Sequence, residues 1–233
     1  MLINTFSISV LEQQSYGAIY AFSVRTYSSD FKDIQNVRVI KNTDPAALRR
    51  GTGGRSSFNG YVATVFGATG FLGKSLTNQL GKIGTQLIIP YRGNFDDEEV
   101  KSLKLTGDLG QVLFQHFYLK DYDSIKKAIK YSNVVINLIG RHFETKNFSY
   151  EDVHVQGARA IARACREVGV DRLIHVSSLS VTENPPKFYM RKPCGFLPSK
   201  LRGEAAVKEE FPDVTIVRPA TMTGWDSKFL WYD

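Results

Sequence analysis

A loop of regularly spaced glycines, Gly67-Ala68-Thr69-Gly70-Phe71-Leu72-Gly73, constrains the fold of this chain more than any other feature. It follows the apolar run 61–66, which is typical of a strand buried on both faces, and it precedes leucines at helical spacing. In this strand–loop–helix context, Gly67 permits a tight turn, Gly70 lets the backbone approach a pyrophosphate, and Gly73 lets the helix pack closely. The sequence therefore predicts a phosphate-binding loop at a helix N-terminus. The alternative is a glycine-rich turn without a ligand.

Strand and helix patterns alternate along the rest of the chain. Helical faces are indicated by Leu72, Leu76, Leu80 and Ile83, and later by Ala158, Ile161, Ala162 and Cys165. An acidic patch at 96–99 opens another expected helix, and a further one is expected around 199–210. The expected strands are 61–66, 86–91, 112–119, 133–139, 172–176 and 214–217. Strands separated by helices predict an α/β fold, a Rossmann-type doubly wound parallel sheet, with the chain ending soon after the sixth strand.

The N-terminal sixty residues differ from this pattern. Residues 1–27 contain one acid, Glu12, and many hydroxyl side chains, which is typical of a mitochondrial transit peptide. Arg25-Thr26-Tyr27-Ser28 resembles a matrix-protease cleavage site. The alternative is a poorly ordered start. Residues 28–60, with the stretch RGTGGRSSFNG at 50–60, are expected to form an extended arm or linker, and 61–233 the Rossmann domain.

Composition excludes several classes of protein. The two cysteines lie far apart, which excludes a disulfide framework or a cysteine-based zinc site and fits a reducing compartment. No apolar run approaches the roughly 18–20 residues of a membrane span. The net charge of +7 suits an acidic partner or a phosphate-rich ligand, although a solvated basic surface explains it equally well. No nucleic-acid-binding motif accompanies that charge, so we expect no nucleic acid partner.

The end of the second expected strand bears on which dinucleotide would bind. NAD-binding proteins usually place an acid there, where it holds the ribose 2′-hydroxyl. This chain has Tyr91-Arg92-Gly93, and the nearest acids, Asp96 and Asp97, come later in the loop. Because an arginine can hold a 2′-phosphate, Arg92 predicts NADPH as the cofactor, with NADH less favoured. An ordinary surface charge is the alternative reading of Arg92.

The GxxGxxG loop together with six strand–helix units resembles the extended or atypical branch of the short-chain dehydrogenase/reductase superfamily. The segments 51–60, 65–74, 88–93, 107–114, 133–141 and 144–148 are more specifically similar to the NAD(P)H-binding accessory subunits of mitochondrial respiratory complex I. This resemblance covers about residues 45–225. It implies a protein bound to other complex I subunits on the matrix side of the inner membrane, peripheral to that membrane, holding NADPH without joining the electron path. It also implies that Leu119, Gly140 and Pro219 flank the cofactor.

Active members of the superfamily use a Tyr-x-x-x-Lys pair, in which the lysine holds the nicotinamide ribose and lowers the tyrosine pKa. In the matching stretch of this chain, Lys200 is present and Phe196 replaces the tyrosine. Tyr189 lies at the wrong spacing, and Leu179 stands where the partner hydroxyl is expected, between Ser178 and Ser180. The resemblance therefore implies binding without turnover. The alternatives are an active NADPH-dependent reductase or epimerase, and a redox-sensing regulator with a protein partner.

Two further residues have side chains capable of catalysis, but we interpret both as structural. His154 lies on the helix after the fourth expected strand and could be imagined as a base, but we expect a surface or core-edge histidine. Cys165 lies at an apolar helical position, where we expect core packing. The resemblance implies a further C-terminal portion that caps the cleft and contacts other subunits, so the chain ending at Asp233 is interpreted as a fragment or as a truncated gene product.

Overall fold

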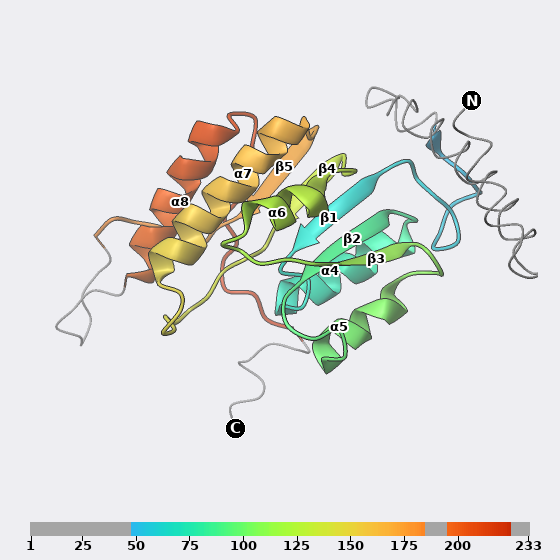
Figure 1. Cartoon of the computed structure of the whole chain (residues 1–233), viewed down its shortest axis with the longest axis horizontal. Helices are drawn as coiled ribbons and strands as arrows, with labels where there is room; N and C mark the ends of the chain where they lie inside the picture. Colours follow the sequence, from blue (N-terminus) through green and yellow to red (C-terminus); the bar gives the residue numbers. More distant parts are fainter. Residues whose placement is uncertain (1–47, 185–194, 225–233) are drawn as a thin grey trace, which may run out of the picture. The chain divides into compact units, whose positions relative to one another are not determined.

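The computed structural model describes residues 48–184 and 195–224, which belong to a unit that begins at Asp44 (Figure 1). The expected transit peptide and most of the expected arm lie outside these residues, as do Tyr189 and Cys194. In the part of the chain that is described, no helix is long and apolar enough to cross a membrane.

Among the described residues, six parallel strands form one sheet in the order β3-β2-β1-β4-β5-β6. The strand after β3 returns to the other side of β1, so the sheet is doubly wound, and the predicted fold class is confirmed. The second and fifth strands have the predicted bounds, whereas the others are shorter. The bounds are β1 Val62–Phe66, β2 Gln86–Tyr91, β3 Val112–His116, β4 Val134–Asn137, β5 Arg172–Val176 and β6 Thr215–Val217.

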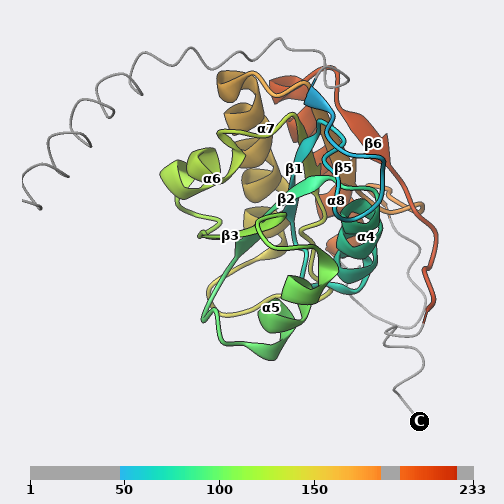
Figure 2. The same cartoon turned by 90° about the vertical axis from the view of Figure 1, so that its right-hand side faces the viewer.

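Helices cover both faces of this sheet, as Figure 2 shows for α6 and α7 on one side and α4 on the other. Helix α7 packs between α6 and α8, and the three share one core cluster with β4 and β5. A second cluster joins α4 and α5 to the other face. The bounds are α4 Phe71–Lys82, α5 Glu98–Leu103, a 3₁₀ turn Lys104–Thr106, α6 Tyr122–Ile129, a π-helical segment Asp152–Gln156, α7 Gly157–Val168 and α8 Phe196–Glu210.

The buried face of α4 differs from the prediction. Gly73, Thr77 and Gly81 are buried, whereas the flanking leucines are only partly buried and Ile83 is 56% exposed. The cause is a close approach of the helix to its neighbours: a Cβ on Gly81 would lie 2.5 Å from the carbonyl oxygen of Thr106. Small residues therefore face inward. On α7 the predicted face is confirmed, since Ala158, Ile161, Ala162 and Cys165 are all buried.

Residues 50–58, expected within an extended arm, fold back into a closed loop instead. The backbones of Arg50 and Phe58 pair with each other through hydrogen bonds of 2.8 and 2.9 Å. Asn59 then anchors the loop, because its side-chain amide donates to the Thr85 hydroxyl at 2.8 Å and its N–H donates to the carbonyl of Gly84 at 3.1 Å. Glycines with positive φ allow the reversal, which the composition alone indicated only as a linker.

Candidate dinucleotide-binding site

A cavity of about 590 Å³ opens at the carboxyl ends of β1, β2, β3 and β4. In a sheet of this order, the crevice where the winding direction changes lies between β1 and β4, and ligands of doubly wound proteins bind there. The expected residues Gly67, Thr69, Gly70, Arg92, Leu119 and Gly140 all line this cavity. Residues from four separate segments of the sequence are therefore brought together at one site.

The glycine loop forms the floor of the cavity because it lies directly against the end of β4. Gly67 has a φ of +80°, which disfavours any side chain, and a Cβ there would lie 3.1 Å from the carbonyl carbon of Leu138. Gly73 packs even more tightly, since its Cβ would lie 2.4 Å from the carbonyl oxygen of Gly67. The spacing of the glycines thus places the start of α4 beside the cavity, with no side chain between them.

Gly70 is the N-cap of α4 and has no side chain to satisfy the first amides of the helix. The first N–H groups of a helix have no partner within it, and the aligned peptide dipoles make this end electropositive. The first turn contains no acid to offset that potential. The glycine loop and the N-terminus of α4 therefore have the shape and polarity that a pyrophosphate requires.

Arg92 follows β2 and lies exposed at the cavity, as the sequence predicts. Two acids that the sequence analysis placed outside the site, Asp97 and Glu99, also line it. Asp97 comes close because the chain turns at Gly93, whose φ is +84° and whose Cβ would lie 3.2 Å from a carboxylate oxygen of Asp97. The part of the cavity at the end of β2, where the 2′ position of the adenine ribose is expected, therefore contains the cation of Arg92 together with the carboxylates of Asp97 and Glu99.

The remaining predicted residues lie around the cavity without lining it. Ala68 is buried in the core, and Phe71, Leu72 and Gly73 belong to the first turn of α4. Pro219 follows β6, where its carbonyl accepts a hydrogen bond of 2.9 Å from the N–H of Leu179. Leu179 itself is 60% exposed. Ala68 and the first turn of α4 thus adjoin the glycine loop, whereas Pro219 is placed beside Leu179, after β6.

Lys200 lies behind Gly140, one of the residues that line the cavity. It is only 6% exposed, and its ammonium donates to the carbonyl of Val176 at 3.3 Å. A Cβ on Gly140 would lie 3.0 Å from this ammonium. Burial lowers the pKa of Lys200 to about 8, although the nearby carboxylate of Glu204 opposes that shift. The lysine is thus placed next to the expected nicotinamide half of the cavity.

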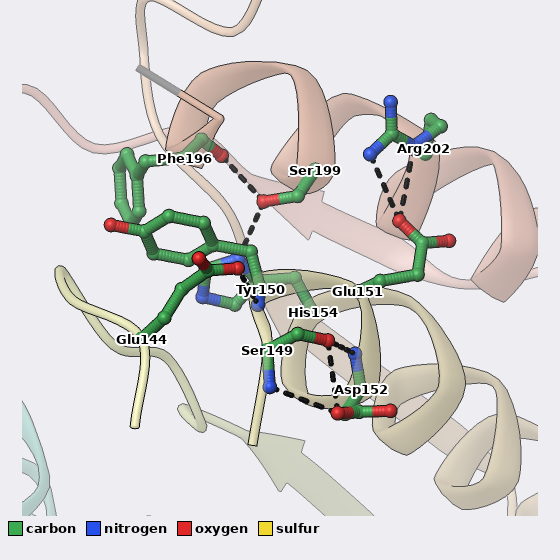
Figure 3. A network of polar contacts seen from close by, with 9 residues as sticks. All are labelled: Glu144, Ser149, Tyr150, Glu151, Asp152, His154, Phe196, Ser199 and Arg202. Atoms are coloured by element: carbon green, nitrogen blue, oxygen red, sulfur yellow. Dashed lines mark hydrogen bonds and ion pairs between the residues drawn. The ribbon is translucent and has the colours of Figure 1, made fainter. Parts of the chain in front are cut away.

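His154 is fully buried, at 2% exposed, which corrects the expectation of a surface or core-edge position (Figure 3). Both ring nitrogens are used: Nδ1 lies 2.7 Å from the Ser199 hydroxyl, and Nε2 accepts from the N–H of Arg141 at 3.1 Å. Burial lowers the pKa of His154 to about 4, and the positive charge of Lys200 contributes. Since Arg141 lines the cavity, the histidine supports one wall of the site.

Phe196 begins α8 and packs its ring among other rings. Its centroid lies 5.0 Å from that of His142 and 5.3 Å from that of His154. The ring of Tyr150 is also close, at 6.2 Å, but its hydroxyl donates to the carbonyl of His142 at 2.8 Å. Phe196 stands where the resemblance implies a tyrosine, and its phenyl ring can neither give nor take a proton.

Several residues of the site were not found from the sequence. Arg141 could have been suspected, because it is a basic residue two positions after the expected fourth strand at 133–139. Phe148 and Val153 line the cavity from the segment after β4, and their sequence context contains no signal for this. Where loops form the walls of a cavity, the lining residues depend on the path of each loop past the edge of the sheet. Local sequence patterns do not encode that path.

Comparison with known proteins agrees with this geometry. Residues 67–229 match the model of a family described as NAD(P)H-binding. The chain is 51% identical over 185 residues to "NADH dehydrogenase (ubiquinone) 1 alpha subcomplex subunit 9, mitochondrial" of Rattus norvegicus, covering 79% of this chain and 47% of the relative. It is 45% identical over 197 residues to "NADH-ubiquinone oxidoreductase 40 kDa subunit, mitochondrial" of Neurospora crassa, covering 84% and 49%. The chain therefore spans about half the length of these relatives.

Solved structures show the same fold at lower identity. A putative NAD-dependent epimerase/dehydratase from Bacillus halodurans superposes with a TM-score of 0.58 at 21% identity, over 72% of this chain and 74% of that one. At such identity the likeness concerns the fold alone.

Proposed function

This chain belongs to the NAD(P)H-binding family, and from that premise we propose that it is the nucleotide-binding part of an accessory subunit of mitochondrial complex I. In this proposal the cavity holds NADPH as a structural element and does not turn it over. The observation that carries the proposal is the glycine loop at the N-terminus of α4, open to a cavity at the winding reversal of the sheet. Membership of the NAD(P)H-binding family supports a nicotinamide cofactor without distinguishing NADPH from NADH.

The choice of NADPH rests on Arg92. A guanidinium can pair with a 2′-phosphate through charge-assisted, bidentate hydrogen bonds. Asp97 acts in the opposite direction, since a carboxylate repels a phosphate and accepts from a free 2′-hydroxyl. Arg92 directly follows β2, whereas Asp97 enters from the next turn, so we assign the 2′ position to the arginine.

The proposed lack of turnover rests on Phe196. A bound reduced nicotinamide supplies a hydride, but reduction of a carbonyl also requires a proton donor. The residues of this chain would bind and orient the cofactor: the α4 amides its phosphates, Arg92 its 2′-phosphate, and Lys200 its nicotinamide ribose. None of the rings around Phe196 offers a free acidic hydroxyl in the described structure, since that of Tyr150 is bonded to a carbonyl.

The proposed setting is the matrix side of the inner membrane, bound to other complex I subunits and peripheral to the membrane. Support for a mitochondrial complex comes from two relatives, one named as a subunit of NADH dehydrogenase and the other as a subunit of NADH-ubiquinone oxidoreductase, both mitochondrial. We further propose that residues 1–27 are a transit peptide and 28–60 a connecting segment before the domain at 61–233. We also propose that the chain is non-catalytic and supports the assembly and stability of the matrix arm, as its resemblance to accessory subunits implies.

An active reductase is the second candidate, favoured by one observation: Lys200 is retained beside Gly140, with its pKa lowered. The two functions are separated by purifying the tagged full chain from mitochondria. Co-migration with complex I on native gels, together with NADPH identified by native mass spectrometry, would support the leading proposal. A free protein that turns NADPH over with a carbonyl substrate would support the alternative.

A further inference from the structure

A second cavity, of about 690 Å³, lies at the opposite edge of the sheet from the nucleotide site, where β2 and β3 begin. Its walls come from the closed loop at 50–58, the turn between α4 and β2, and the turn before β3. We call it the amino-edge pocket, and it is lined by Arg50, Arg55, Ser56, Ser57, Phe58, Gly84, Gln86, Asp108, Leu109, Gly110 and Gln111. None of these residues belongs to the nucleotide cavity.

The walls of the amino-edge pocket are fixed to one another by hydrogen bonds. The Ser57 hydroxyl donates to the carbonyl of Gly54 at 2.7 Å. The Gln111 side-chain amide donates to the carbonyls of Gly81 at 2.8 Å and Thr85 at 3.1 Å, which joins the turn before β3 to the end of α4. The pocket is thus a preformed surface, and this lowers the entropic cost of binding.

Two arginines give the pocket a charge that its own walls do not neutralise. Arg55 donates to the neutral amide oxygen of Asn78 at 3.4 Å, while its buried Nε has no hydrogen-bond partner among the described residues. The Arg50 guanidinium donates to the carbonyl of Arg49 at 3.1 Å. Asp108 is the one acid among the lining residues. The pocket therefore presents a net excess of guanidinium groups.

Two of the lining residues of this pocket, Phe58 and Leu109, are apolar, and we call them its apolar rim. Leu109 lines the pocket and is fully exposed, and Ile83 precedes the lining residue Gly84. Exposed aliphatic side chains gathered beside a specific polar pocket are typical of a protein interface.

We infer that the amino-edge pocket is a docking site for a polypeptide segment that presents a carboxylate next to an aliphatic side chain. Resting on the proposed function, we assign that segment to a neighbouring subunit of the complex. A carboxylate matches the fork of a guanidinium, and the rim would cover the aliphatic neighbour. The chain's own residues 1–47 are less suitable, because their four acids, Glu12, Asp30, Asp33 and Asp44, are balanced by four bases, Arg25, Lys32, Arg38 and Lys41.

The test uses the full chain expressed in mitochondria that lack the endogenous protein. Arg50→Glu and Arg55→Glu reverse the pocket charge, and Lys127→Glu makes the same change at an exposed position on α6. We expect each pocket variant to reduce co-migration with complex I by about tenfold, as expected for a desolvated ion pair, and the control to leave it unchanged. The melting temperature of each pocket variant, with and without NADPH, must match that of the wild type. Folded pocket variants that co-migrate like the wild type would overturn the inference.

A photo-crosslinking residue at Leu109 separates this inference from the proposed function. We expect a cross-link to an acidic segment of another protein, identified by mass spectrometry, and none from the same group placed at Lys127. A cross-link to residues 1–47 of the chain itself, or no cross-link, would overturn the inference even if the protein co-migrates with complex I. A cross-link to an acidic segment outside complex I would retain the docking site and refute the proposed complex.

Discussion

The imidazole of His154 and the hydroxyl of Ser199 lie 2.7 Å apart and join two distant segments of the chain. The hydroxyl already donates to the carbonyl of Phe196 at 2.7 Å, so it accepts from the histidine, and the proton lies on Nδ1. Nε2 is then free to accept from the N–H of Arg141 at 3.1 Å. A neutral histidine thus ties the first turn of α8 to the loop that lines the nucleotide cavity.

This arrangement predicts a loss of stability at mildly acidic pH. Burial lowers the pKa values of His154 and His175 to about 4, below the ordinary value of 6.5. Between these values the unfolded chain binds more protons than the folded one, so the free energy of unfolding falls as pH falls through this window. We expect a loss of about 2 kcal/mol per histidine at pH 5, measured by urea unfolding from pH 7.5 to pH 5.

The variant His154→Gln should lower stability at pH 7.5 but halve the further loss on acidification. Gln79→Ala, at an exposed position on α4 and without a titratable group, is the control and should leave the pH dependence as in the wild type. An unchanged pH dependence in His154→Gln would show that this imidazole is not held neutral.

Removing the Ser199 hydroxyl should weaken both the fold and the nucleotide cavity. Ser199→Ala leaves the Nδ1 proton of His154 without its acceptor in a buried place, which costs about 1–3 kcal/mol. We expect that loss in the free energy of unfolding, together with weaker cofactor binding through the displaced Arg141 loop. The control Ser75→Ala, exposed on α4, should change neither quantity. Wild-type cofactor affinity in Ser199→Ala would argue against the coupling.

The absence of a proton donor at Phe196 predicts that the protein has no carbonyl reductase activity. Oxidation of NADPH, followed by its absorbance with aldehydes, ketones and nucleotide sugars, should not exceed the background rate. Phe196→Tyr should restore weak activity at most, because Leu179 stands where the partner hydroxyl is expected. Steady oxidation by the wild type that Lys200→Met abolishes would contradict the proposal and favour the reductase.

The acid-poor start of the chain predicts import and cleavage. We expect protein purified from mitochondria to begin near Ser28 or Ser29, after the Arg25-Thr26-Tyr27 pattern. N-terminal sequencing tests this, and Arg25→Ala should shift or slow the cleavage. An intact Met1 on the mitochondrial protein would refute the transit peptide.

The fold was predictable because its main signals are local. The buried strand at 86–91 and the face formed by Ala158, Ile161, Ala162 and Cys165 follow from residue patterns that tertiary contacts reinforce. The face of α4 was not predictable in this way, because Gly73 and Gly81 are buried by close approach of other backbone segments. Likewise, the anchoring of the closed loop at 50–58 depends on hydrogen bonds from Asn59 to a turn some 25 residues away.

The site was predictable at positions where the backbone or the ligand requires a particular type of residue. Gly67 and Gly70 were recognised from the spacing of the glycines. Arg92 was recognised because it stands where NAD-binding proteins usually have an acid. Asp97 and Arg141 enter the cavity because of loop paths, and no spacing rule encodes those paths. The burial of His154 depends on α8, which lies more than forty residues away in sequence.

Direct binding of NADPH and NADH to the purified chain, by titration calorimetry, tests the central claim most directly. We expect NADPH to bind about ten- to a hundredfold more tightly than NADH, with Arg92→Gln removing the preference and Asp97→Asn increasing it. Gly70→Val should abolish binding of both while the protein stays folded, because φ at Gly70 is −74° and its Cβ would meet only the Gly67 oxygen, at 3.3 Å. Equal affinity for the two cofactors, or binding that survives Gly70→Val, would contradict this account.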